Sequence, residues 1–235
     1  MKHHQVSALY LVLNLLTISF PLVRSFEPRV NYSSRWKALF PALFITATFF
    51  LVWDVIFTRN GVWGFNPDYL VGISLLSLPI EEWMFFFTVP FASVFIYDCI
   101  HVFFNKISTN NATRVATLIL GLMLIVLALA NQSKSYTFWN FSFAGIYLIL
   151  IGVLNPVWLG KFWLAYIIHL IPFILVNGIL TGSFLESPIV WYNNLQNLAI
   201  RIFSIPIEDT IYALLLLLMN VSIYEMLNKR FQLRT

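Results

Sequence analysis

The chain has 235 residues, of which 60% are hydrophobic and only 10% are charged, and its mean hydropathy is +0.81. A soluble domain averages about 45–50% apolar and about 25% charged residues. The composition therefore excludes an ordinary water-soluble domain and predicts an integral membrane protein. The net charge is +4, but the basic residues stand at the ends of apolar runs, which indicates orientation in a membrane and not nucleic-acid binding. The single cysteine, Cys99, excludes a disulfide framework within one chain, and the scattered histidines predict no metal site.

Seven apolar runs are long enough to cross a bilayer, which takes about 20 residues. In chain order they cover residues 4–23, 37–57, 79–103, 113–130, 138–154, 161–181 and 205–227. The first run resembles a signal peptide, but its end at residues 20–24 (Phe-Pro-Leu-Val-Arg) lacks the small-x-small cleavage pattern, so we expect it to remain as a span. The sequence predicts an all-α polytopic membrane protein with about seven transmembrane helices.

The basic residues divide unequally between the two sides that alternate loops define. Four lie on one side, at positions 2, 59, 134 and 201. Ten lie on the other: Arg24, Arg29, Arg35, Lys37, Lys106, Arg114, Lys161, Lys229, Arg230 and Arg234. Positive charge favours the cytoplasmic side. The C-terminus is therefore predicted in the cytoplasm and the N-terminus outside, in a multi-pass protein of the cell membrane.

Two apolar stretches do not fit simple spans. Residues 69–103 form one run that is longer than a single crossing needs, and residues 188–203 are apolar with interspersed amides. One stretch contains Pro79 ahead of its helix, and the other comes just before Pro206. Because proline interrupts regular structure, each stretch is predicted to begin as an interfacial or re-entrant segment that bends at the proline into the next span.

A repeat lies within the chain. Residues 77–82 (Ser-Leu-Pro-Ile-Glu-Glu) match residues 204–209 (Ser-Ile-Pro-Ile-Glu-Asp), and residues 94–98 match residues 221–225 at the same offset of 127. The two copies are four spans apart, which gives them the same orientation and predicts a parallel repeat. The predicted organisation is a first repeat at 1–105, a linker with a transmembrane helix at 106–135, and a second repeat at 136–235.

The repeated acids are the candidate catalytic residues. Carboxyl groups at membrane depth are costly and suggest function, and burial favours the neutral acid, so two pairs facing one cavity could supply both an acid and a base. The alternative is that the motifs only start helices, since proline suits the first turn and acids favour the helix N-terminus. The four motif acids are Glu81, Glu82, Glu208 and Asp209.

Three further residues are predicted at the same site. Asp54 lies at the depth of the motifs, either as a third acid in the cavity, which is the preferred interpretation, or as a partner for Arg59. Phe85 and Tyr212 follow the first acid of each motif by four residues, so each ring shares a helix face with that acid and could stabilise a carbocation.

Two other features limit the chemistry. Residues 97–98 (Tyr-Asp) and 224–225 (Tyr-Glu) lie about 25 Å further along the helices, too far for proton transfer, and are interpreted as anchors in the membrane interface. The sequence has no dinucleotide fingerprint, P-loop or diphosphate-binding aspartate cluster, so no cofactor is expected.

The doubled Pro-x-Glu-(Glu/Asp) motif, at residues 79–82 and 206–209, resembles that of the flavin-independent, CarR-type lycopene cyclase domain family in its single-chain fused form. The resemblance covers nearly the whole chain. It implies β-ionone ring formation at the ends of lycopene, an isomerisation that gives γ-carotene and then β-carotene without flavin. It also implies lycopene dissolved in the lipid bilayer as substrate, and other carotenoid-biosynthesis enzymes as candidate partners.

Other functions stay open at this point. One is a cyclase that forms a different ring type or acts on a C50 carotenoid. Another is a seven-helix proton-coupled transporter or pigment-binding protein. A retinal protein would need a lysine in mid-span, whereas the lysines here lie at span ends, and transporters more often show inverted repeats.

Overall fold

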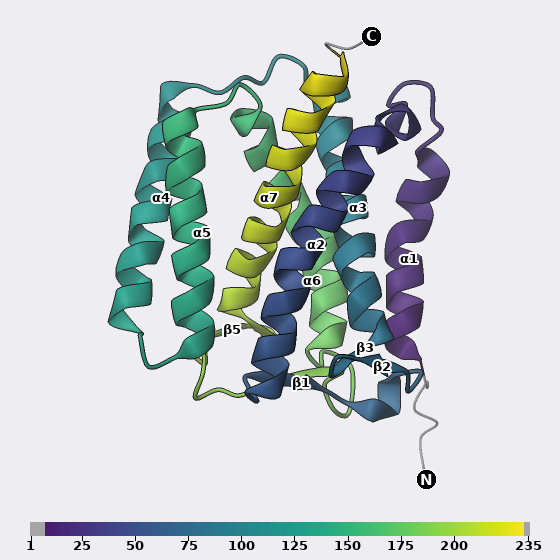
Figure 1. Ribbon diagram of the computed structural model, residues 1–235, viewed down its shortest axis with the longest axis vertical. Coiled ribbons are helices and arrows are strands. Elements are labelled where there is room, and N and C mark those ends of the chain that lie inside the picture. Colours follow the sequence, from purple (N-terminus) through teal and green to yellow (C-terminus); the bar gives the residue numbers. More distant parts are fainter. Residues whose placement is uncertain (1–7, 233–235) are drawn as a thin grey trace.

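The computed structural model describes residues 8–232, and within them seven α-helices run up and down side by side (Figure 1). They are α1 (Leu9–Arg24), α2 (Trp36–Arg59), α3 (Ile80–Phe103), α4 (Asn111–Ala130), α5 (Ser135–Leu154), α6 (Leu159–Leu180) and α7 (Ile207–Gln232). Six of them, α2 to α7, are long and apolar enough to cross a membrane, whereas α1 has 16 residues. The chain is a predominantly helical, multi-pass membrane protein.

Each predicted span overlaps one of these helices, although the ends differ by several residues. The start of the first predicted span, at residues 4–7, lies outside the described residues, as do Lys2 and Arg234, which entered the orientation argument. Short 3-10 helices, η1 (Tyr32–Arg35) and η2 (Pro67–Tyr69), lie in the connections on either side of α2.

Helices α3 and α7, which begin with the two acidic motifs, form the centre of the bundle. Helix α3 packs against α1, α2, α6 and α7, and α7 packs against α2, α3, α5 and α6. Helix α4 lies at the outside against α5 (Figure 1), where a Cβ atom on Gly121 would come within 2.9 Å of the Gly145 carbonyl oxygen. Glycine at these two positions therefore allows the two backbones to approach closely.

The two irregular apolar stretches form short β-hairpins that lead into the central helices. Strand β2 (Ser74–Leu75) pairs with β3 (Leu78–Pro79), and β5 (Arg201–Ile202) pairs with β6 (Ile205–Pro206), both antiparallel. The chain turns from Pro79 directly into α3 and from Pro206 directly into α7, as the sequence predicted. The hairpins carry exposed apolar side chains, among them Leu76 and Phe203.

A third two-stranded sheet joins the connections ahead of these hairpins. Strand β1 (Trp63–Phe65) pairs antiparallel with β4 (Val190–Tyr192), with Gly64 opposite Trp191. All three sheets lie at the end of the bundle where α3 and α7 begin (Figure 1), so they cover that end of the central helices.

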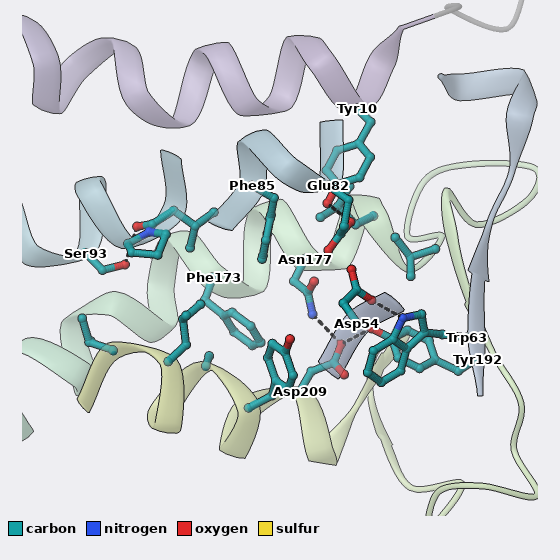
Figure 2. Close-up of a pocket in the computed structure, with 18 of the residues that line it drawn as sticks. Tyr10, Asp54, Trp63, Glu82, Phe85, Ser93, Phe173, Asn177, Tyr192 and Asp209 are labelled. Carbon is teal, nitrogen blue, oxygen red and sulfur yellow. Dashed lines mark hydrogen bonds between the residues drawn. The ribbon is translucent and has the colours of Figure 1, made fainter. Parts of the chain in front are cut away.

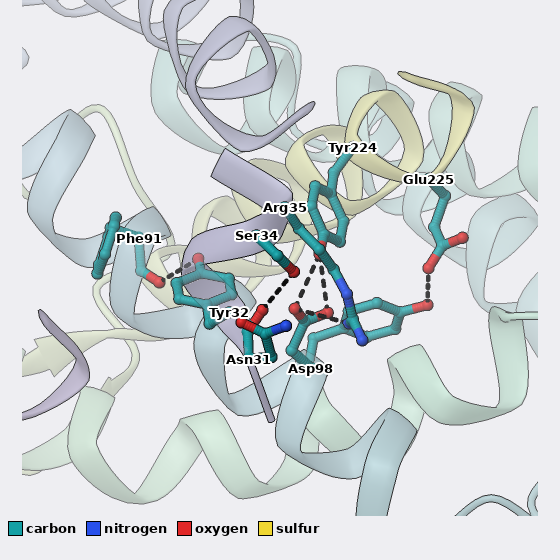
Figure 3. A network of polar contacts seen from close by, with 9 residues as sticks. Asn31, Tyr32, Ser34, Arg35, Phe91, Asp98, Tyr224 and Glu225 are labelled. Carbon is teal, nitrogen blue, oxygen red and sulfur yellow. Dashed lines mark hydrogen bonds and ion pairs between the residues drawn. The ribbon is translucent and has the colours of Figure 1, made fainter. Parts of the chain in front are cut away.

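At the opposite end, tyrosines and acids join α3 to α7 reciprocally (Figure 3). The hydroxyl of Tyr97 donates to Glu225 at 2.5 Å, the hydroxyl of Tyr224 donates to Asp98 at 2.8 Å, and Arg35 from η1 forms an ion pair with Asp98 at 2.9 Å. Both tyrosines are fully buried. The prediction that these residues are anchors in the membrane interface is therefore wrong, because their side chains bind each other and not the surroundings.

Candidate active site

A narrow cavity lies among α1, α2, α3, α6, α7 and the start of α5, next to the β1–β4 sheet, and contains three of the predicted acids. Figure 2 shows the side chains of Asp54, Glu82 and Asp209 pointing toward one another from α2, α3 and α7. Its free volume is about 70 Å³. The polar and aromatic lining residues are Tyr10, Asp54, Trp63, Phe65, Glu82, Phe85, Ser93, Tyr136, His169, Phe173, Asn177, Tyr192, Asp209 and Tyr212.

Glu82 and Asp209 are the second acids of the two motifs, each in the first turn of its helix. Asp54 comes from the last part of α2, whose C-terminal end lies beside the start of α3 (Figure 1). All three side chains are buried. The preferred prediction for Asp54, a place in the cavity, agrees with this position, whereas Arg59 donates to Ser77 at 3.3 Å.

The three acids differ in the number of hydrogen bonds they accept. Asp209 accepts three, from Tyr136 (2.7 Å), Asn177 (2.8 Å) and Tyr192 (2.9 Å). Glu82 accepts one from the hydroxyl of Tyr10 at 2.5 Å. Since hydrogen bonds stabilise the charged form of a carboxyl group, Asp209 is the best prepared of the three to be ionised.

Asp54 holds the least satisfied oxygen of the cavity. Its Oδ1 accepts from the indole N–H of Trp63 and, at 3.5 Å, from the hydroxyl of Thr58. No group in the described part of the chain bonds to its buried Oδ2. A buried carboxyl oxygen without a partner is costly, which favours a proton on this group or on a neighbour that can donate to it.

The charge in the cavity is not balanced by a cation in the part of the chain that the structure describes. The ion pairs within the described residues join Arg24 with Glu27 and Arg35 with Asp98, and both pairs lie at the end of the bundle far from the cavity. Arg201, at the near end, bonds instead to the Ser204 carbonyl oxygen. Three buried carboxylates without a counter-ion would repel one another strongly.

The structure places the first acid of each motif away from the cavity. Glu81 accepts a hydrogen bond from the backbone N–H of Val71 at 2.6 Å, and Glu208 accepts one from the backbone N–H of Leu198 at 2.7 Å and one from Thr137. Neither side chain lines the cavity. Through these hydrogen bonds, each first motif acid holds the segment that precedes the hairpin against the first turn of the helix that follows it.

Aromatic rings form much of the cavity wall. Phe85 and Tyr212, both predicted at the site, line it together with Trp63. The ring of Tyr212 packs against Phe50 and Trp53, with ring centroids 4.9 and 5.1 Å apart. Burial and the nearby Asp209 raise the pKa of the Tyr192 hydroxyl well above its ordinary value, so this group stays protonated and donates to Asp209.

Sequence reasoning missed the tyrosines that bind the acids. Tyr10 bonds to Glu82 and Tyr136 to Asp209, and each tyrosine is followed four residues later by an asparagine, Asn14 or Asn140, that donates to the backbone carbonyl of the first motif acid. The Tyr-x-x-x-Asn pattern recurs at an offset of 126. That second repeat signal could have identified these residues.

Two other polar groups of the cavity region contact each other. His169 lies on α6, and its Nδ1 is 3.0 Å from the hydroxyl of Ser93 on α3. Within residues 8–232, no three His, Cys, Asp or Glu side chains are arranged to hold a metal ion.

The lycopene cyclase family model matches residues 7–100 and 133–227 of this chain. Two fungal proteins, each named bifunctional lycopene cyclase/phytoene synthase, are similar in sequence. The one from Aspergillus niger is 34% identical over 82 residues, which cover 31% of this chain and 14% of that protein. The one from Neurospora crassa is 26% identical over 153 residues, which cover 60% of this chain and 21% of that protein.

The matched regions thus span only about a fifth or less of the length of these relatives. No solved structure matches the chain. The family model, in contrast, matches well over half of the chain, including both acidic motifs and all three acids of the cavity. The chain belongs to the lycopene cyclase family.

Proposed function

We propose that this protein is a lycopene β-cyclase that closes β-ionone rings at the ends of lycopene, giving γ-carotene and then β-carotene in carotenoid biosynthesis. One observation carries the proposal beyond family membership. Three buried carboxyl groups, which have no counter-ion within residues 8–232, face one another in an aromatic-walled cavity. Such a cavity can hold a hydrocarbon end group and offer it both an acid and a base.

The acid is the pair formed by Asp54 and Glu82, which share a proton. This assignment follows from comparing the two sides of the cavity. Asp209 receives an amide N–H from Asn177 and a hydroxyl from Tyr192. Asp54 holds on α2 the position that Asn177 holds on α6. A hydrogen bond can join Asp54 and Glu82 only if one of the two acids is protonated.

The base is Asp209, which its three donors hold as a carboxylate. In the reaction, the Asp54–Glu82 pair adds its proton to the terminal double bond of the end group, which leaves a tertiary carbocation. The neighbouring double bond attacks that cation and closes the six-membered ring. Asp209 then removes a ring proton to form the new double bond, so one proton enters and one leaves.

The reaction is an isomerisation with no net redox change, and the protein is accordingly an intramolecular lyase or isomerase. Proton transfer from Asp209 back to the Asp54–Glu82 pair restores the starting state. The rings of Phe85, Trp63 and Tyr212 lie on the cavity wall, where their faces stabilise the cation between the two proton transfers.

The chain is also proposed to consist of two three-helix halves, α1–α3 and α5–α7, joined by α4. The hydrogen bonds of Tyr10 and Tyr136, of Val71 and Leu198, and of the two hairpins recur 126 or 127 residues apart. The two segments matched by the family model begin at residues 7 and 133 and end at 100 and 227, which gives the same offsets. The distribution of basic residues favours a cytoplasmic C-terminus in the cell membrane.

Expression in a lycopene-accumulating bacterium tests the function. The red lycopene is expected to disappear and β-carotene to accumulate, as measured by chromatography against standards. A monocyclic product would limit the activity to one end, and ε-ring products would correct the ring type. Unchanged lycopene, with the protein present in the membrane fraction, would contradict the proposed function.

The first motif acids are proposed to position the site and not to transfer protons. Glu81→Gln keeps a carbonyl oxygen that can accept the Val71 N–H, so cyclisation is expected to fall less than about tenfold. Glu81→Ala leaves that N–H without its partner and should lower both activity and thermal stability further. The same order is expected for Glu208→Gln and Glu208→Ala. Equal and complete loss in the Gln and Ala variants would assign proton transfer to these acids.

A further inference from the structure

An apolar groove continues from the cavity along the membrane-spanning part of α3 and α6 and reaches α1. This first groove shares six lining residues with the cavity: Phe85, Val89, Ser93, His169, Phe173 and Asn177. It continues past them to Thr17 on α1, Ile96 on α3 and Val176 on α6. In Figure 2, Ser93 and Phe173 lie on the side of the acids that leads into this groove. The cavity and the first groove therefore adjoin each other along these six shared side chains.

A second groove lies between α2 and α5, on the face of the bundle that corresponds to the first in the other half. It is lined by Phe49, Trp53, Trp139 and Phe143, among others. None of the described residues that line this second groove also lines the cavity. The second groove is thus a depression in the outer surface that stops short of the acids.

The residues at corresponding positions explain the difference. Tyr10 and Tyr136 set an offset of 126 between α1 and α5, and Asp54 and Asn177 set an offset of 123 between α2 and α6. With these offsets, Thr17 corresponds to Phe143 and Val176 to Trp53. Two small side chains of the first groove are therefore bulky aromatic rings in the second.

These rings pack against one another between the second groove and the cavity. The ring centroids of Phe143 and Trp53 are 5.2 Å apart, those of Phe143 and Phe49 are 5.5 Å apart, and Trp53 also packs against Tyr212 at 5.1 Å. Trp53 is buried. On the first groove, the hydroxyl of Thr17 bonds back to the Leu13 carbonyl at 2.8 Å, so the residue adds little bulk and no free donor there.

We propose that the first groove is the lateral portal through which the linear carotenoid reaches the acids from the bilayer, and that it holds the unreacted part of the polyene during ring closure. The proposal rests on the proposed function. From Glu82 to Ile96 the cavity and the first groove together follow α3 over 14 residues, about 21 Å at 1.5 Å per residue. A long, stiff polyene with one end at the acids must occupy such a path, and the aromatic wall blocks the equivalent path on the other face.

One portal has a consequence for a substrate with two ends. Because the second groove does not reach the acids, the carotenoid cannot pass through the bundle to bring its second end to them. After the first ring closes, the molecule must leave through the first groove, turn around, and enter again with its other end. The free volume of the first groove is about 50 Å³, so binding requires side chains such as Phe85 and Phe173 to move aside.

Matched substitutions on the two grooves test the portal. Thr17→Phe and Val176→Trp place at the first groove the residue types found at the second, and should lower cyclisation by about tenfold or more. Thr48→Phe and Val52→Trp make the same chemical changes on exposed positions of the second groove, and should stay within about twofold of the unaltered protein. Equal effects on the two grooves, or none on either, would overturn the proposal.

A second measurement separates blocking from misfolding. In a Cys99→Ser background, Thr17→Cys and Thr48→Cys are purified as active proteins and then labelled with an apolar maleimide. Labelling at position 17 should stop cyclisation, whereas labelling at position 48 should not. Full activity after complete labelling at position 17 would refute the portal, while absence of cyclisation in the unaltered protein would instead refute the proposed function.

Discussion

Glu82→Gln and Asp209→Asn are each expected to lower lycopene cyclisation by about 10²- to 10⁴-fold, the usual contribution of a positioned acid or base. The amide in Glu82→Gln can still accept the hydroxyl of Tyr10 but cannot hold or give the proton. The amide oxygen in Asp209→Asn can still accept some of the three hydrogen bonds that the Asp209 carboxyl accepts, but the amide cannot take the ring proton. Conversion of lycopene by purified protein in vesicles is the measurement.

The matched control is Glu186→Gln, which makes the same change at an exposed position in the loop after α6 and should leave activity within about twofold. The double variant, Glu82→Gln with Asp209→Asn, should have nearly the same cyclisation activity as the less active of the two single variants. The effects of residues that act as one unit are not additive. If Glu82→Gln cyclised lycopene at the unaltered rate, the acid would have to be Asp54 alone or a group outside the cavity.

Much of this fold follows from length and apolarity. The seven apolar runs each overlap one helix, and the prolines at 79 and 206 mark the start of α3 and α7. These signals are strong because a span must be long and because proline cannot continue a strand into a regular ladder. The hairpins themselves were predicted only as irregular apolar segments, since their pairing depends on the backbone turn and not on a pattern of residues.

The candidate site was predicted at the level of the motif but not of the single acid. Adjacent residues on a helix point about 100° apart, so Glu81 and Glu82 cannot both face one cavity. The sequence contains no sign of which acid does, because that depends on where the preceding segment packs. The structure resolves it through the Val71 N–H, which binds Glu81 and leaves Glu82 facing Tyr10.

The tyrosines show a different limit. Tyr10 and Tyr136 lie 72 and 73 residues from the acids they bind, on helices whose place in the bundle the apolar pattern does not define. The interpretation of Tyr97 and Tyr224 as interface anchors failed for the same reason. A tyrosine near a span end suits a membrane interface, but these two face another helix that supplies an acid at hydrogen-bond distance.

Asp54→Asn is expected to separate activity from stability. With an amide at position 54, Glu82 receives an N–H donor, as Asp209 does from Asn177, and so becomes a second stable carboxylate. The site then lacks its acid, and cyclisation should fall by about 10²- to 10⁴-fold. The same change removes a buried carboxyl group with an unpaired oxygen, so the melting temperature in detergent should stay the same or rise.

Asp68→Asn provides the control for this variant, because Asp68 is exposed on η2 near the same end of the bundle. It should change neither activity nor melting temperature appreciably. A loss of activity in Asp54→Asn that came with a lower melting temperature would show that Asp54 supports the fold. Normal cyclisation in Asp54→Asn would leave Glu82 as the sole acid, and the comparison of Asp54 with Asn177 would then carry no catalytic meaning. Only lost activity in a protein at least as stable as the unaltered one fits a proton shared between Asp54 and Glu82.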